Sequence, residues 1–412
     1  MKLTKEVVET FEYIPEPEAV EEMVEKYPSL LSFELFGRTW ELRPFALCVV
    51  IAAVCALALL WMTARRSGLK KKETPATLGL LLLPLGLVFA RAFYVLASWT
   101  WFEEIGLQHT LYLWEGGYAM WGAFIGCALA VLLTSRISKE RPSVLFDACA
   151  APMALFIALC RFAAYPFSGE SRGYLIEETS FFCRLPFAVQ EDGEWYWAVF
   201  ILEGIVALII MAVLLSGRRK NGEKAVLFLI LYSASQIYCE GLHGTAGKMV
   251  WHQFVRIPQL VCAVVLAVLF IAGVIRRNRS SESCRLPGIR IAELAVALFH
   301  GLALVIAMEF ARDKPLLLSV PVCCIIIADA GFLIGYAVRS FLNHPSAGRT
   351  AEMSVLLLLG AAIAAGGIIN MGTPLSLPVG LCYILMAAGC VIAGYAVYRA
   401  ALDPARSGTK GA

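Results

Sequence analysis

The chain has 412 residues, of which 59% are hydrophobic and 16% are charged, and its formal net charge at pH 7 is +3. The apolar residues form repeated blocks of about 20, the length of a helix that crosses a bilayer. This pattern excludes a soluble globular protein and predicts an all-α, polytopic transmembrane helical bundle. The 13 cysteines show no CxxC or ligand-like spacing, so we expect no disulfide framework, metal site or cofactor.

The first 44 residues precede every apolar block and are expected to form a small outer segment. Residues 1–28 are polar and acidic and lack the apolar core of a signal peptide, so insertion should begin at the first span. Two prolines ahead of Glu18–Lys26 predict a short acidic helix. Apolar and polar residues alternate on both sides of Gly37, which predicts a β-hairpin over 33–42.

Apolar runs between helix breakers predict about 11 membrane spans. Their expected positions in chain order are Phe45–Ala64, Leu78–Ala97, Tyr118–Thr134, Leu145–Ala164, Ala198–Leu215, Ala225–Leu242, Gln259–Ile275, Ile291–Ala311, Leu316–Val338, Met353–Ile369 and Leu377–Tyr398. The polar stretch 276–290, which contains Pro287 and Gly288, separates a domain of about seven spans over 45–275 from an extension of about four spans over 291–412.

Loops rich in Lys and Arg alternate with loops poor in them, and this bias sets the orientation of the spans. Basic clusters such as Lys70–Lys72 and Arg218–Lys220 follow the odd-numbered spans, whereas the loop 99–117 has no Lys or Arg. The alternation predicts an N-terminus outside the membrane and a C-terminus in the cytoplasm.

Ionisable side chains gather at one expected depth, near the outer ends of the first seven spans. They are Arg43, Arg91, Glu115, Arg161, Glu170, Arg172, Glu240 and His243. An isolated arginine such as Arg161 is often one that snorkels to the interface. Charged groups within the membrane cost about 2.5–3.5 kcal/mol each, however, so several together predict a polar cavity open to the outer leaflet.

Glycines near the third span have two interpretations. Gly122 and Gly126 have the GxxxG spacing of tight helix packing. Gly116 and Gly117, at the entry to this span, could instead let backbone amides face a phosphate.

Arginines with a few carboxylates suit an anionic head group, because a guanidinium binds phosphate oxygens through two parallel hydrogen bonds. A phospholipid has such a head group and arrives from the bilayer itself. The chain contains no P-loop, GxSxG elbow or HExxH motif, which disfavours transfer from a nucleotide and zinc-dependent hydrolysis.

At these residues the chain resembles the prolipoprotein diacylglyceryl transferase family over roughly 33–275. Residues 90–95 (ARAFYV) look like its AR-x-x-Y-V segment, and Trp114–Gly117 with Gly122 and Gly126 looks like its W-x-GG…HGG…G stretch. Further matching positions are Asp147, Arg161, Gly169-Glu170, Gly173, the Glu203-Gly204 pair, Glu240 and Gln259. The chain departs from the pattern at Trp121 (family His), Ala163 or Ala164 (Asn), Gln236 and His243 (Arg), and Phe45 (Tyr).

The resemblance implies an enzyme in the bacterial cytoplasmic membrane that transfers diacylglyceryl from phosphatidylglycerol to the cysteine thiol of a prolipoprotein lipobox, within the signal peptide, at the outer face. We also expect the protein to contact other membrane lipids, and we expect no binding to nucleic acid. Arg161, Glu170, Glu240 and His243 are the expected catalytic residues. Expected substrate-binding residues are Arg91, Tyr94, Gly116, Gly117, Gly173 and Gln236.

Two points stay open from the sequence. With the family histidine replaced by Trp121, the base that takes the thiol proton is His243, His109 or Glu240. The same replacement also fits an alternative, a noncatalytic membrane protein descended from this fold that binds lipid or lipoprotein. A transporter of small anions ranks below both, because the chain lacks inverted repeats.

Overall fold

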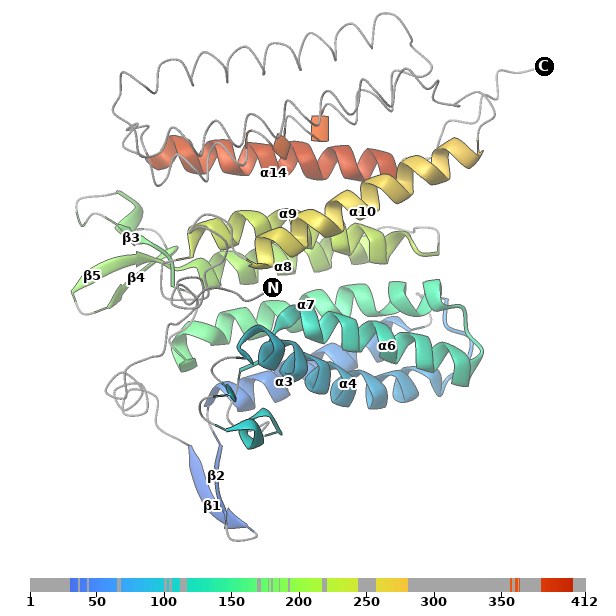
Figure 1. Cartoon of the computed structure of the whole chain (residues 1–412), viewed down its shortest axis with the longest axis horizontal. Coiled ribbons are helices and arrows are strands. Elements are labelled where there is room, and N and C mark those ends of the chain that lie inside the picture. The colour runs from blue at the N-terminus through green and yellow to red at the C-terminus, as the bar shows by residue number, and fades with distance from the viewer. Residues whose placement is uncertain are drawn as a thin grey trace, which may run out of the picture. The chain divides into compact units, whose positions relative to one another are not determined.

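The computed structural model describes much of the first two thirds of the chain and its last apolar block (Figure 1). The described residues are 30–35, 38–42, 44–64, 68–99, 102–103, 106–111, 117–168, 172–176, 178, 181–184, 186–191, 193–216, 221–243, 257–280, 356–357, 360–361, 363 and 379–402. The expected acidic helix at 18–26 and the expected spans at 291–311 and 316–338 lie outside this set, as does most of the expected span at 353–369.

The described residues form long apolar helices. They are α3 (Pro44–Thr63), α4 (Thr74–Ala97), α6 (Met120–Ser138), α7 (Pro142–Ser168), α8 (Val199–Ser216), α9 (Glu223–Leu242), α10 (Ile257–Ser280) and α14 (Val379–Ala401). Within the described residues, seven helices are long and apolar enough to cross a membrane, and α10 carries a shorter apolar stretch, Pro258–Gly273. The protein is therefore an all-α, multi-pass membrane protein, as predicted.

The expected spans match these helices closely. Each of the first seven, and the last, coincides with one described helix. The match is close because a helix satisfies its own backbone hydrogen bonds in lipid, so an apolar run of this length has one stable form there. The helix α10 continues to Ser280, so the start of the expected polar linker is helical.

The described helices belong to two compact units. The first unit contains Met1–Phe228 and Leu242–Met249, and the second contains Leu229–Gly241 and Val250–Ala412. In the second unit α10 packs against α14 at Gly273, where an added Cβ would lie 2.6 Å from the carbonyl oxygen of Ala400. Nearby, Arg276 donates a hydrogen bond to the carbonyl of Ala401 (3.0 Å).

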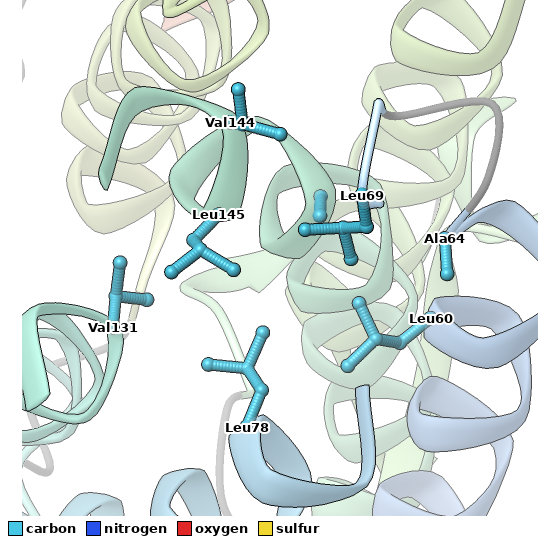
Figure 2. Packing of buried hydrophobic residues seen from close by; sticks show 8 residues of the cluster. Leu60, Ala64, Leu69, Leu78, Val131, Val144 and Leu145 are labelled. Carbon is cyan, nitrogen blue, oxygen red and sulfur yellow. The ribbon is translucent and has the colours of Figure 1, made fainter. Parts of the chain in front are cut away.

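In the first unit α4 and α6 pack with their backbones in close approach. A Cβ on Gly122 would lie 2.3 Å from the carbonyl oxygen of Phe89, and one on Gly126 would lie 2.3 Å from that of Leu85. The GxxxG pair therefore serves helix packing. An apolar cluster joins α3, α4, α6 and α7, and its side chains point toward one another (Figure 2). Its buried members are Leu60, Ala64, Leu69, Leu78, Val131, Val144, Leu145 and Ala148.

The loops at one end of the first unit are tied together by two carboxylates. Glu140 Oε1 accepts hydrogen bonds from the backbone N–H groups of Lys70 (2.9 Å) and Lys71 (3.2 Å). Asp147 on α7 accepts from the N–H groups of Gly222 (2.6 Å) and Ala225 (2.9 Å), at the start of α9. The negative charge of Asp147 thus meets the first turn of a helix, where unpaired N–H groups favour an anion.

Short strands lie in the connections at the other ends of these helices. The strands β1 (Leu31–Leu35) and β2 (Arg38–Leu42) pair antiparallel, with Leu35 opposite Arg38, which confirms the expected hairpin. A second sheet has the order β3-β5-β4, with β3 at Leu175–Ile176, β4 at Ala188–Glu191 and β5 at Glu194–Trp197. This sheet was not predicted from the sequence. It lies beside the N-terminal end of α8 (Figure 1).

Candidate functional site

A single buried carboxylate joins two basic side chains at the end of the first unit where α7 ends and α8 begins. We call this region the site end. Arg161 Nε on α7 lies 3.3 Å from Glu203 Oε2 on α8. His243, the residue after α9, places Nε2 3.4 Å from Glu203 Oε1. The contact between Arg161 and Glu203 is an ion pair by distance, without the alignment of a good hydrogen bond.

The three side chains differ in exposure. The side chain of Glu203 is 3% exposed, that of His243 is 12% and that of Arg161 is 19%. A buried carboxylate without compensating charge is costly, and the guanidinium of Arg161 offsets that cost. The two basic groups are the more exposed members, so they are the ones that a ligand at the site end can reach.

Glycine packing brings Glu203 and Arg161 together. A Cβ on Gly204 would come within 2.4 Å of the ring of Phe162, so α8 lies directly against α7 at this point. Close by, the rings of Tyr165 and Phe200 are stacked, with centroids 5.1 Å apart. Because Arg161 precedes Phe162 and Glu203 precedes Gly204, this contact determines the spacing of the ion pair.

A second glycine holds His243 in place. Gly173 donates a hydrogen bond to the carbonyl of Trp197 (2.7 Å) and forms an isolated β-bridge with His243. The N–H of Tyr174 donates to the carbonyl of Leu242 (3.3 Å). A Cβ on Gly173 would lie 2.5 Å from Trp197 Cβ. The backbone around Gly173 thus connects β5 to the end of α9, next to His243.

Arg91, an expected ligand of the substrate phosphate, is 4% exposed. Its guanidinium donates hydrogen bonds to the backbone carbonyls of His109 (2.6 Å), Thr110 (3.4 Å) and Gly117 (3.4 Å). It also lies over the ring of Phe102, 5.1 Å from the centroid. These contacts give Arg91 a structural task, which is to hold the segment that contains η1 (Leu107–Leu111) against α4.

The other expected residues of this region lie near Arg91. Gly117 has a positive φ of 72°, and a Cβ there would come within 2.3 Å of the ring of Tyr94. The ring of Tyr94 packs edge-on against Phe102, with centroids 6.1 Å apart. Gly117 therefore needs to be glycine for backbone conformation and for space. Gly116, Glu115 and Glu170 lie outside the described residues.

Gln236 and Glu240 lie on the part of α9 that belongs to the second unit. Gln236 is 5% exposed and its Nε2 donates to Glu240 Oε1 (3.1 Å). The expectation that Glu240 lies within reach of Arg161 stays a prediction.

Arg172, beside Gly173, is engaged with the small sheet. Its guanidinium forms an ion pair with Glu191 on β4 and lies over the ring of Tyr196, 4.5 Å from the centroid. Burial alone would lower the pKa of Arg172, but the hydrogen bond and charge of Glu191 outweigh it and raise that pKa above its ordinary value. Arg172 therefore stays charged and holds the sheet in place.

Sequence reasoning noted Glu203 within the Glu203-Gly204 pair but did not select it as a site residue. A signal was present, because Glu203 is the one charged residue of α8, and an ionisable group inside an apolar span usually marks a site. Together, a guanidinium, a carboxylate and an imidazole provide the groups needed to bind an anion and to accept a proton.

The chain is also similar in sequence to known proteins. The family model for prolipoprotein diacylglyceryl transferase matches residues 32–275. The chain is 27% identical over 260 residues to the phosphatidylglycerol–prolipoprotein diacylglyceryl transferase of Clostridium novyi (strain NT), with 61% of this chain and 97% of that protein covered. The enzyme of the same name from Listeria innocua serovar 6a is 30% identical over 241 residues, with 56% and 84% covered. That from Bacillus velezensis is 29% identical over 241 residues, with 56% and 87% covered.

The matched region includes the helices α3 to α9 and each member of the cluster Arg161–Glu203–His243. It covers more than half of the chain. The chain therefore belongs to the prolipoprotein diacylglyceryl transferase family.

Proposed function

We propose that this protein transfers the diacylglyceryl group of phosphatidylglycerol to the lipobox cysteine thiol of a prolipoprotein, at the outer face of a bacterial cytoplasmic membrane. The observation that carries the proposal is the cluster of Arg161, Glu203 and His243, which lies within the family match and at the end of the helices expected to face outward.

The reaction has three requirements. The sulfur must form a bond to the glycerol carbon that carries the phosphate, while the bond between that carbon and the phosphate oxygen breaks. The leaving group is glycerol phosphate, and its developing charge needs a cation. The thiol proton must pass to a base, because the thiolate is the nucleophile.

Arg161 is the best candidate for the phosphate. Its side chain is the most exposed of the cluster, whereas the guanidinium of Arg91 donates hydrogen bonds to three backbone carbonyls. The fork of a guanidinium matches two phosphate oxygens at once. Glu170 then positions Arg161 or the glycerol, and His243, His109 or Glu240 takes the thiol proton.

One observation favours the noncatalytic alternative. Trp121 stands where the family has histidine, and it packs edge-on against Phe124, with ring centroids 5.1 Å apart. An aromatic packing residue cannot accept a proton, so a transferase reaction here needs a base from elsewhere in the chain.

The test is complementation of a bacterium depleted of its own transferase, followed by mass measurement of a lipobox peptide. A mass increase of one diacylglyceryl group on the cysteine, lost in Arg161→Ala, supports the transferase. If the protein binds phosphatidylglycerol vesicles but yields no modified peptide, the noncatalytic alternative holds instead.

A further inference from the structure

We propose that Glu203 is a positioning residue that makes His243 the proton acceptor for the acceptor thiol. The inference rests on the proposed transferase function and identifies the base that this function requires. It starts from one geometric fact, the approach of Glu203 Oε1 to within 3.4 Å of His243 Nε2.

The chemistry of the contact determines the tautomer of His243. A carboxylate only accepts hydrogen bonds, so the imidazole nitrogen that faces it carries the hydrogen. The hydrogen therefore belongs on Nε2, which leaves the ring's lone pair on Nδ1. A carboxylate behind an imidazole also stabilises the imidazolium that forms when the ring accepts a proton.

Other ionisable side chains lie on the segments that contact this pair. On α7, Arg161 contacts the same carboxylate of Glu203 that His243 contacts. Tyr165 lies one turn further along α7. From the segment after α7, Arg172 is held by Glu191 and by the ring of Tyr196. Among the described residues, Glu203 is thus the one carboxylate in contact with both Arg161 and His243. It brings together the arginine proposed to bind the phosphate and the histidine proposed as the base.

The two other candidate bases have different contacts. Glu240 accepts a hydrogen bond from Gln236 (3.1 Å). His109 is partly exposed in η1, and its backbone carbonyl is engaged by Arg91. His243 contacts Glu203, the same carboxylate that contacts Arg161.

The experiment uses the full-length protein in vesicles of phosphatidylglycerol, with a lipobox peptide as acceptor, and measures thioether formation from pH 6 to 9.5. The variants are His243→Gln, His243→Arg, Glu203→Gln and His109→Gln. The control is Glu178→Gln, a change at an exposed carboxylate of the site end. Phosphatidylglycerol binding is measured for each variant.

We expect His243→Gln and His243→Arg to lower turnover at pH 7 by about 100-fold or more, with lipid binding retained. Their activity should rise about 25-fold between pH 7 and pH 9, because a thiol with a pKa near 8.5 ionises without help over that range. Glu203→Gln should lower turnover and also respond to alkaline pH. Glu178→Gln should behave like the parent, and His109→Gln should show no alkaline rescue.

Four results would overturn the proposal. If His243→Arg keeps the parent rate, position 243 needs only a cation. If the His243 variants bind lipid but gain nothing at alkaline pH, the lost step is not removal of the thiol proton. If His109→Gln shows the alkaline rescue instead, the base is His109. A parent protein that forms no thioether product at all refutes the transferase function itself, and with it this role of the pair.

Discussion

Gly204 lies directly against the ring of Phe162, so close that a Cβ there would come within 2.4 Å of Phe162 Cε1. The residues that precede these two in the chain, Glu203 and Arg161, form the ion pair of the site. Packing and charge are therefore linked, because any change that separates α7 from α8 here also lengthens the contact between the charged groups.

The first prediction follows from this contact. Gly204→Ala should destabilise the purified protein by about 1–3 kcal/mol, the usual cost of overpacking, and should lower transferase turnover. Thermal unfolding in detergent and thioether formation measure the two effects. The control is Gly86→Ala on α4, where an added Cβ meets only Cys127 Sγ at 3.5 Å. Equal behaviour of the two variants would contradict the prediction.

The second prediction concerns Arg161. Arg161→Ala should abolish turnover, and Arg161→Lys should also lower it strongly, because an ammonium is a point charge that cannot replace a fork of donors. Removing one partner of a buried ion pair also leaves the other charge uncompensated, at a cost of about 3–5 kcal/mol. Thioether formation and phosphatidylglycerol binding are measured together. Parent-level values for both in Arg161→Ala would make Arg161 an interfacial anchor.

The third prediction concerns the link between α7 and α9. Asp147→Asn should destabilise the protein by about 1–3 kcal/mol, because one amide oxygen replaces two carboxylate oxygens and the charge at the helix N-terminus is lost. Unfolding in detergent measures this change. Glu223→Gln is the control, since it removes a charge from the same first turn of α9 but leaves both hydrogen bonds of Asp147 in place. A larger effect from Glu223→Gln would show that charge alone matters.

The fourth prediction separates two roles of Arg91. If its task is structural, Arg91→Lys should increase hydrogen exchange over 106–111 and 117–119, because a lysine cannot reach three carbonyls as a guanidinium does. Exchange elsewhere, such as in the start of α9, serves as the internal control. Weaker phosphatidylglycerol binding with unchanged exchange would instead support the substrate-binding role expected from the sequence.

The fifth prediction is the orientation of the chain. A reporter that is active only in the cytoplasm should be active when fused after Ala412, because basic loops follow the odd-numbered spans. A reporter active only outside the cytoplasmic membrane should be silent at that position. The reverse result would refute the orientation and would place the site end on the cytoplasmic side.

The spans and the hairpin could be predicted from the sequence because each depends on local pattern. In lipid, an apolar run of this length is stable only as a helix. The alternation of apolar and polar residues around Gly37 fixes the register of the hairpin. The sheet of β3, β4 and β5 could not be predicted in this way. Its strands have two to four residues, which is too short for a periodic signal, and β5 pairs with both β3 and β4.

The site could be predicted only in part. Arg161 and His243 were selected because charges are rare in apolar segments, and the structure brings both to Glu203. Their common partner is 40 residues from His243 in the chain, and such long-range pairing has no local signature. A charged residue within an apolar span predicted that Arg91 binds a ligand. The structure shows its guanidinium donating to backbone carbonyls, which every residue has and no sequence pattern reveals.

Arg91 also bears on how the chain is made. Its carbonyl partners lie 18, 19 and 26 residues later in the chain. At a synthesis rate of about 5–20 residues per second, they leave the ribosome about 1–5 seconds after Arg91. Until then, the charge of Arg91 raises the free energy of inserting this otherwise apolar segment into the membrane by about 2.5–3.5 kcal/mol. We therefore expect α4 to reach its final depth only when the segment after it and α6 have emerged, so that the two helices insert during translation as one unit.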